Sequence, residues 1–336
     1  MKTPTVSRSN PLKLLFVLAT LAVIPALGQD KIDPAAWGSD HVGKPIPEYV
    51  HGDECLFCHR NDIGTTWQKN AHGVTIRERE DAPELQTMLK GQSALASQAS
   101  AVEHFLGSRH RVRFLKKDGY GKFAILTAQA ALSEPRIPPE SSPASVKLLN
   151  VGNLEWVKGT FGVKCAGCHT TGVDPKDQTF GAFGLDCYVC HGDVSLEHTN
   201  DTKLILLSKK NRSDAKVITS LCAQCHLRDS KSKSTGMPYP NNFVAGDNLF
   251  KDLQVDWSRA DDEKLNPGDR HVWKNVRDVA LYGKESITCL SCHAIHANSD
   301  QKHRRVLRAE ICSECHKGEG YKDLKPFTVT SQLCEY

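Results

Sequence analysis

The longest apolar run of the chain lies close to its N-terminus. Residues 14–24 are apolar except for Thr20, and Lys2, Arg8 and Lys13 come before the run. The run has 11 residues, whereas a membrane-spanning helix needs about 20. Small residues follow at Ala26 and Gly28, which is typical of a cleaved export signal over 1–28, the alternative being an uncleaved membrane anchor. We therefore expect an exported protein, periplasmic or extracellular, without a transmembrane segment in the mature chain.

Beyond residue 28 the patterned segments are short. Residues 94–106 predict a helix. Residues 112–115 and 123–127 predict a β-hairpin around the turn Asp118-Gly119-Tyr120-Gly121. A stripe of Val272, Val276 and Val279 predicts a helix that is capped by Asp269 and Gly283 and carries His271 one position off the stripe. Residues 135–143 and 229–242 are rich in Pro, Ser, Lys or Asn and indicate loops.

The net charge of the chain limits which partners are expected. The chain of 336 residues has 43 basic and 39 acidic side chains, a net charge of +4. Removal of the signal leaves +1, which is too close to neutral for the electrostatic footprint of a nucleic-acid-binding protein. Nucleic acid is therefore not expected as a partner.

The distribution of cysteine is the strongest signal in the sequence. Twelve of the 13 Cys form six C-x-x-C pairs, and His follows each pair directly. Random placement would give about 0.02 such motifs in a chain of this composition. The pairs are Cys55 and Cys58, Cys165 and Cys168, Cys187 and Cys190, Cys222 and Cys225, Cys289 and Cys292, and Cys312 and Cys315.

This pattern is the attachment signature of c-type haem. Two thiols one helical turn apart can each add to a haem vinyl group, and the next His then lies under the iron as its proximal ligand. The proximal ligands are therefore expected to be His59, His169, His191, His226, His293 and His316, and the cofactors to be six covalently attached haem c groups. Disulfides or zinc sites also use Cys pairs, but neither explains a His after every pair. Cys334 is left over and is interpreted as an inert terminal residue, the alternative being a free or intermolecularly paired thiol.

The second axial ligand of each iron is predicted from the His and Met residues that lie outside the motifs. Nine His lie outside the motifs, and the mature chain has only Met88 and Met237, so His/Met ligation can serve two haems at most. We therefore predict that two His ligate most of the irons, which gives haems of low potential. We assign His72, His198 and His296, which each lie near a motif in sequence, and add His271, His51 and His110 to them. His41, His104 and His303 compete for the same places.

Residues 48–317 resemble the multihaem c-type cytochromes typified by the tetrahaem partner of hydroxylamine oxidoreductase, the cytochrome c-552/c-554 type. The resemblance is carried by the motif at Cys55 with Trp67 and His72, by Cys165 to Gly172, by Cys187 to His198, and by Cys289 to His296. It implies that His72, His198 and His296 are distal ligands, and that the protein is an extracytoplasmic electron carrier with tightly packed haems. This chain differs in having six motifs, not four.

These observations predict a fold of mainly short α-helices and loops wrapped around stacked haems, with a small β-hairpin and little regular secondary structure. The expected divisions are the signal at 1–28, a one-haem region with the hairpin at 29–150, a three-haem region at 151–230, a linker or loop at 231–268, and a two-haem region at 269–336.

The predicted function is electron transfer between redox partners such as other cytochromes, quinol-linked enzymes or terminal enzymes. One alternative is a redox enzyme for small nitrogen or sulfur compounds with one open, five-coordinate haem. The other is a subunit of a cytochrome filament or other oligomer.

Overall fold

The structure is a computed structural model that describes residues 31–107, 111–132, 146–208 and 214–296. The expected signal at 1–28, the loop at 135–143, His110, the sixth motif at Cys312, Cys315 and His316, and both His303 and Cys334 lie outside these residues. The described residues group into one compact unit. Within the described part of the chain, no helix is both long enough and apolar enough to cross a membrane.

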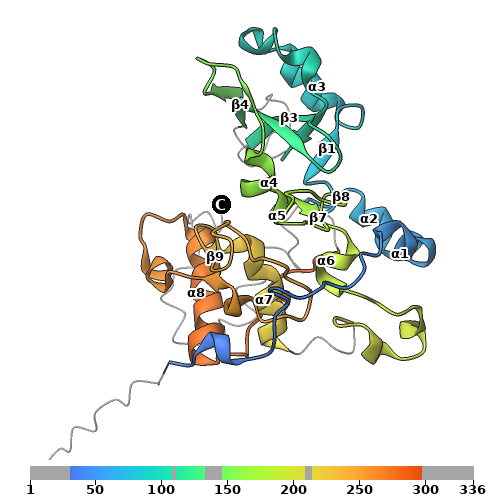
Figure 1. Ribbon diagram of the computed structural model, residues 1–336, viewed down its shortest axis with the longest axis vertical. Helices are drawn as coiled ribbons and strands as arrows, with labels where there is room; N and C mark the ends of the chain where they lie inside the picture. Colours follow the sequence, from blue (N-terminus) through green and yellow to red (C-terminus); the bar gives the residue numbers. More distant parts are fainter. Residues whose placement is uncertain (1–30, 108–110, 133–145, 209–213, 297–336) are drawn as a thin grey trace, which may run out of the picture. The chain divides into compact units, whose positions relative to one another are not determined.

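Short helices and strands alternate along the chain (Figure 1). The α-helices are α1 (Gly52–His59), α2 (Thr65–Trp67), α3 (Pro83–Lys90), α4 (Thr160–Lys164), α5 (Ala166–His169), α6 (Cys187–His191), α7 (Ala215–His226), α8 (Pro267–Tyr282) and α9 (Cys289–Cys292). The strands are β1 (Ile76–Glu78), β2 (His104–Leu106), β3 (Arg111–Lys117), β4 (Phe123–Leu132), β5 (Val146–Leu149), β6 (Trp156–Val157), β7 (Thr170–Thr171), β8 (Ala182–Phe183), β9 (Lys231–Ser232) and β10 (Leu253–Gln254). The predicted class of short helices and loops with antiparallel β-structure is confirmed.

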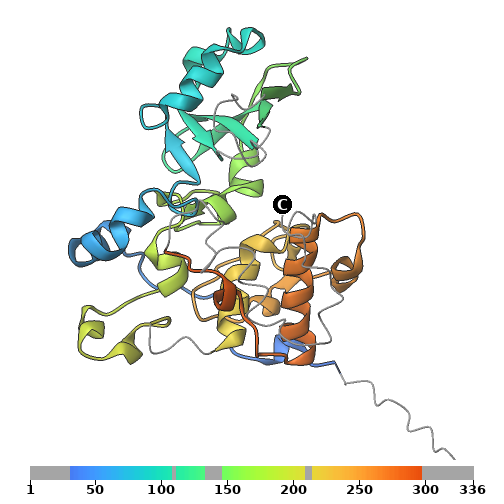
Figure 2. The ribbon, with the colours of Figure 1, turned by 180° about the vertical axis from the view of Figure 1, so that it is seen from behind.

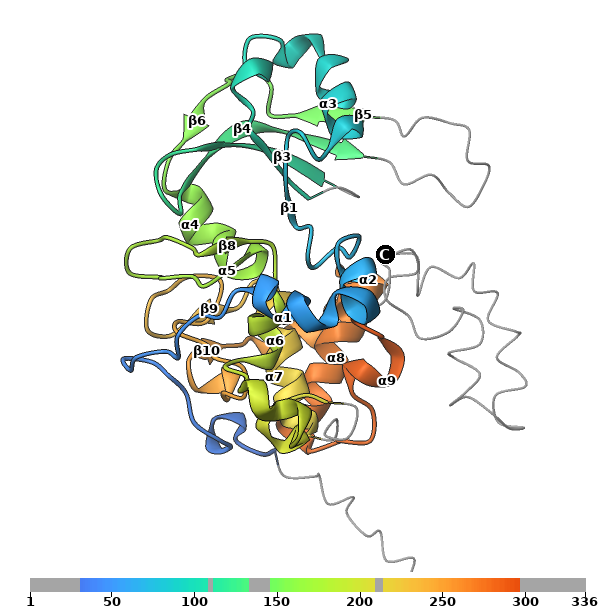
Figure 3. The same ribbon diagram turned by 90° about the vertical axis from the view of Figure 1, so that its right-hand side faces the viewer.

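The predicted hairpin is present and belongs to a larger sheet. Strands β3 and β4 are antiparallel and are joined by a turn that Lys122 closes, its N–H donating to the Gly119 carbonyl at 3.3 Å. Gly119 and Gly121 both have positive φ (112° and 60°), which a side chain would disfavour. The sheet has six strands in the order β1-β2-β3-β4-β5, and β6 also pairs with β4. Strands β5 and β6 pair with different ends of the long strand β4, both along the edge opposite β3, and Figure 3 shows them apart at these two ends.

Both faces of this sheet are covered. On one face, Leu85 and Leu89 of α3 pack with Phe105, Phe114 and Leu126, all buried. On the other face, Leu115 and Phe123 pack with Phe161 of α4 and Ala166 of α5 in a second cluster. Because α5 carries Cys168 and His169, the sheet holds the second motif through ordinary side-chain packing.

The third buried cluster joins α7 to α8. Ala223 and Leu227, in and just after α7, pack with Trp273 and Val276 of α8 and with Phe250. The two helices run side by side in both Figure 1 and Figure 2. Trp273 is the largest fully buried side chain of the described residues, and the cluster supports the end of α7, where the fourth motif lies.

The expected helix over 94–106 is wrong. This segment has 3₁₀ turns at Ser93–Leu95 and Ala99–Ala101 and then becomes strand β2. Pairing of β2 with both β1 and β3 satisfies its backbone, and Phe105 becomes fully buried. The gain from pairing and burial outweighs the helix preference of the local alanines.

The start of the last long helix is also corrected. Helix α8 begins at Pro267, and its N-cap is Asn266, whose side chain accepts a hydrogen bond from the Asp269 N–H at 2.9 Å. Asp269 therefore lies in the first turn, where its charge suits the helix dipole. Gly283 ends the helix as predicted, in a left-handed conformation with φ of 61°.

The segment 231–268, expected as a linker or loop, is a packed loop region. The buried Asp252 carboxylate accepts hydrogen bonds from Ser232 Oγ at 2.6 Å, Asn241 N at 2.8 Å and Ser234 N at 3.0 Å. Since one carboxylate organises three points of the loop, the segment has a defined path beside α7 and α8.

Candidate haem sites

Five of the six motifs lie in the described residues, each at a short helix. They begin in α1, directly before α5, in α6, in the last turns of α7 and in α9. Residues three apart in a helix share a face, so the two cysteines of a pair that lies within a helix are on the same side of it. This is the geometry that attachment at two neighbouring vinyl groups requires.

One carboxylate connects the first and third motifs. Asp186 caps α6 by accepting from Tyr188 N at 3.0 Å, and it also accepts from Gly52 N, the first residue of α1, at 3.3 Å. The hydroxyl of Tyr49 donates to the same carboxylate. Burial raises the pKa of Asp186 above its usual value. The starts of both motif helices therefore depend on a single, partly buried acid.

Thiols of different motifs face one another in pairs. Cys55 contacts Cys187, Cys168 contacts Cys225, and Cys222 contacts Cys289. The hydrogen bond from Cys187 lowers the pKa of Cys55 to about 7, whereas the same contact and burial raise the pKa of Cys187. All ten motif cysteines of the described residues are free thiols, as thioether formation requires.

Imidazole rings also meet in pairs, each joining one motif His to one of the three distal candidates. The ring centroids of His59 and His198 are 6.1 Å apart, with 29° between the ring planes. Those of His191 and His296 are 5.9 Å apart at 31°. The third pair is His226 with His72, at 6.3 Å and 72°.

These spacings match the requirement of a metal between two imidazoles. A ligating nitrogen lies about 2 Å from its metal and about 1 Å from its own ring centre, so two imidazoles on opposite sides of one iron have centroids about 6 Å apart. Three independent pairs have this separation, so the residues present fit a haem iron with two His ligands.

The protonation of the motif histidines suits the same role. Burial lowers the pKa of His169 to about 4, helped by the nearby charge of Arg228. Burial also lowers the pKa of His191 to about 4, and repulsion from His296 and His59 adds to the effect. Both imidazoles are therefore neutral at neutral pH, and a neutral ring nitrogen is what binds a metal.

Two imidazoles are oriented by hydrogen bonds at Nδ1. His198 donates from Nδ1 to the Ser195 carbonyl at 2.7 Å, and the Nδ1 of His59 lies 3.2 Å from Asp62 Oδ2. Partners of this kind hold the tautomer whose Nε2 is available to a metal.

The remaining candidates are placed differently. His51 is the N-cap of α1 and packs on Tyr49, with ring centroids 4.5 Å apart. His271 is exposed on α8. Within the described residues, neither makes a ring contact with a motif histidine, so their role as ligands stays a prediction.

Two histidines outside the assignment have partners in the fold itself. His41 bonds through Nδ1 to both carboxylate oxygens of Asp247, at 2.8 and 2.9 Å. His104 is buried in the sheet between the rings of Phe123 and Phe183. Their surroundings indicate structural roles.

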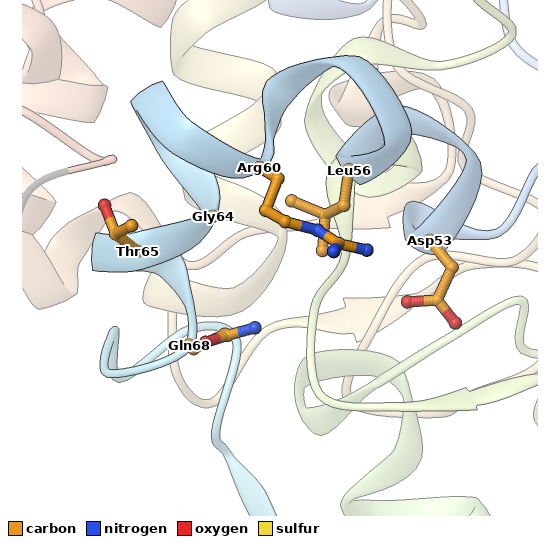
Figure 4. A pocket seen from close by; sticks show the side chains of 6 residues that line it. All are labelled: Asp53, Leu56, Arg60, Gly64, Thr65 and Gln68. Atoms are coloured by element: carbon orange, nitrogen blue, oxygen red, sulfur yellow. The ribbon is translucent and has the colours of Figure 1, made fainter.

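A small cavity lies beside the first motif, with a volume of about 390 Å³. It is lined by Asp53, Leu56, Arg60, Gly64, Thr65 and Gln68. In Figure 4 the Arg60 side chain extends past Leu56 towards Asp53. The cavity therefore presents polar groups on the outer side of α1.

Known proteins support the interpretation of the motifs. The family model described as cytochrome c3 matches residues 158–238, which include the second, third and fourth motifs. No curated protein matches the chain.

Two solved structures are similar. The crystal structure of the outer cell wall cytochrome OcwA aligns with a TM-score of 0.50 and 19% identity, covering 81% of this chain and 68% of that one. An undecahaem cytochrome from the S-layer of Carboxydothermus ferrireducens aligns with a TM-score of 0.44 and 18% identity, covering 82% of this chain and 44% of that one. The more specific resemblance to the partner of hydroxylamine oxidoreductase is not among these findings. The family match covers three of the attachment motifs, and the likeness to OcwA shows that the two chains share a fold.

Proposed function

We propose that this protein is an exported six-haem c-type cytochrome that passes electrons between redox partners through bis-His haems. The observation that supports this most directly is the set of three imidazole pairs with centroids 5.9 to 6.3 Å apart. Each pair joins the His of an attachment motif to a His from another part of the chain.

In this proposal each pair holds one iron. His59 and His198 ligate the first haem, His191 and His296 the third, and His226 and His72 the fourth. When bound, the haem supplies reversible one-electron chemistry at its iron. The motif thiols would tether the porphyrin edge, and the two imidazoles of each pair would ligate the iron.

The same assignment favours electron transfer over substrate chemistry. An iron with two protein ligands has no open position for a substrate, and two imidazoles without a thioether keep its potential low. His271, His51 and His110 are proposed for the haems whose second ligand is not assigned by a ring pair.

The expected export signal and the likeness to OcwA support a proposal for the location and the partners. The signal at 1–28 directs the chain out of the cytoplasm, and OcwA, which shares the fold, is an outer cell wall cytochrome. We therefore place the protein outside the cytoplasmic membrane, with other redox proteins as partners. Assembly into an oligomer or filament is compatible with this placement.

The first experiment is to count the haems and their spin states. Denaturing mass spectrometry of the mature holoprotein should give the chain plus six haems, and EPR of the oxidised protein should show low-spin iron. Four or fewer haems would contradict the six-haem assignment. A strong high-spin signal would favour the alternative of a redox enzyme with an open haem.

The second experiment tests the ligand pairs. We expect His72→Ala, His198→Ala and His296→Ala each to retain six haems, gain one high-spin iron and bind carbon monoxide, because the thioether tether remains when a distal ligand is lost. His41→Ala is the matched control and should leave the spectra unchanged, because His41 is bonded to Asp247. Unchanged low-spin spectra in all three variants would refute the assignment.

A further inference from the structure

The contacts between sulfur atoms show which motifs are neighbours in space. Helix α1 touches α6 through Cys55 and Cys187. Helix α5 touches α7 through Cys168 and Cys225. Helix α7 also touches α9, through Cys222 and Cys289. Both cysteines of the fourth motif are therefore in contact with another motif, one with the second and one with the fifth.

The contact between α5 and α7 is reciprocal. Cys168 Sγ lies 4.0 Å from the Gln224 carbonyl oxygen, and Cys225 Sγ lies 3.9 Å from that of Gly167. Each sulfur thus reaches the backbone inside the other motif. A Cβ on Gly167 would lie 2.2 Å from the Tyr239 ring, so this motif needs glycine to pack as it does.

The third motif is next to the fourth as well. The Cys190 thiol lies close enough to Cys222 and Cys225 to act on both electrostatically. In addition, Leu185 donates its N–H to the His72 carbonyl at 2.9 Å, and His72 is the residue that faces His226. The fourth motif and its facing histidine are therefore both anchored beside α6.

We infer that the haem held by Cys222, Cys225 and His226 is a branch point, which exchanges electrons directly with the haems of α5, α6 and α9. Among the sulfur contacts between the described motifs, that of α1 is with α6. This inference rests on the proposed function and specifies the route within it. The route does not follow the order of the motifs in the sequence, because the second motif leads to the fourth and the first leads to the third.

The physical reason is the length of the tether. A thioether bond joins each sulfur to an edge carbon of its haem, so two sulfurs in contact place two haem edges only a few bond lengths apart. In each step one electron leaves a ferrous iron, which becomes ferric, and reduces the ferric iron of the neighbour. No bond forms or breaks, and no proton needs to move.

The test compares two substitutions of the same kind in the holoprotein. His72→Met changes the potential of the branch-point haem, and His198→Met changes that of the α1 haem, while each keeps a ligand on the iron. Haem-methyl NMR signals followed through a stepwise reduction count the other haems whose midpoint potential shifts. We expect three for His72→Met and one for His198→Met. The sixth motif lies outside the described residues, and its haem can add at most one to either number of shifted haems. The number for His72→Met therefore stays larger than that for His198→Met. Equal counts, or a larger count for His198→Met, would overturn the branch point.

A double substitution provides a second test in case His72→Met loses its haem. Replacing Cys289 and Cys292 with alanine removes the α9 haem, and should shift the potential of the haem with His226 while leaving that of the haem with His59 unchanged. The opposite result would overturn the inference. Failure of the proposed function has a different signature, namely high-spin iron or missing haems in the wild-type protein.

Discussion

The six-stranded sheet and the motif helices α1 and α9 differ in what stabilises them. The sheet is held by its own side chains, and Phe105, Phe114 and Leu126 are completely buried within it. Helices α1 and α9 contain no buried residue, and Phe57 of α1 is 86% exposed. An element with so little burial has little hydrophobic stabilisation of its own. The comparison indicates that the sheet is stabilised by its own core, whereas α1 and α9 depend on contacts with other groups.

The middle of the chain links the two kinds of structure. Helix α4 and the start of α5 pack on the sheet through Phe161 and Ala166, while Cys168 at the end of α5 contacts Cys225 of α7. The second motif is thus the one that the sheet positions directly.

The largest expected effect comes from preventing haem attachment. In a chain produced without haem ligation, we expect amides of α1 and α9 to exchange with solvent rapidly and amides of β3 and β4 to stay protected. The reason is that the sheet buries its own apolar side chains, whereas α1 and α9 contain no buried residue. Hydrogen–deuterium exchange of the haem-free and haem-loaded chains measures this difference. Equal loss of protection in both regions would show that the sheet also depends on haem.

Truncation of a core side chain tests the contribution of the sheet to stability. Phe114→Ala should lower the free energy of unfolding of the sheet by about 3–5 kcal/mol, the usual cost of removing a buried aromatic ring. The visible absorption spectrum should be unchanged, because Phe114 packs on the face of the sheet away from α5. Denaturant unfolding followed by far-UV circular dichroism measures the loss. Tyr120→Ala, at a side chain that is 90% exposed, is the control and should change stability by less than about 0.5 kcal/mol.

The smallest expected effect concerns the capping acid Asp186. Asp186→Ala removes the cap of α6 and the contact with Gly52 N, and should lower stability by about 1–2 kcal/mol. It should also shift the potentials of the haems of α1 and α6, since both helices start at this carboxylate. Asp256→Ala removes a comparable cap from a 3₁₀ turn (Trp257–Asp261) that carries no motif. If both variants shifted haem potentials alike, Asp186 would have no special role in joining the two motifs.

Much of the local chemistry can be read directly from the sequence. The attachment motif is a matter of neighbouring residues, because two thiols at positions i and i+3 and a histidine at i+4 need only one turn of backbone. The hairpin before residue 132 and the cap at Gly283 are local in the same sense, and the structure confirms both. The helix expected over 94–106 was wrong because strand pairing with distant residues decided that segment.

Which distal His faces which motif His could not be predicted from the sequence. Nearness in sequence to a motif brought out His72, His198 and His296, but it did not indicate which motif each would face. In the structure His198, near the third motif, faces the first, and His296, near the fifth, faces the third. His72 faces His226 on α7. The sequence by itself predicts the sites of covalent attachment, since these depend on adjacent residues. The tertiary structure alone decided the pairing of imidazoles and the contacts between sulfurs, because these depend on how loops far apart in the chain pack together.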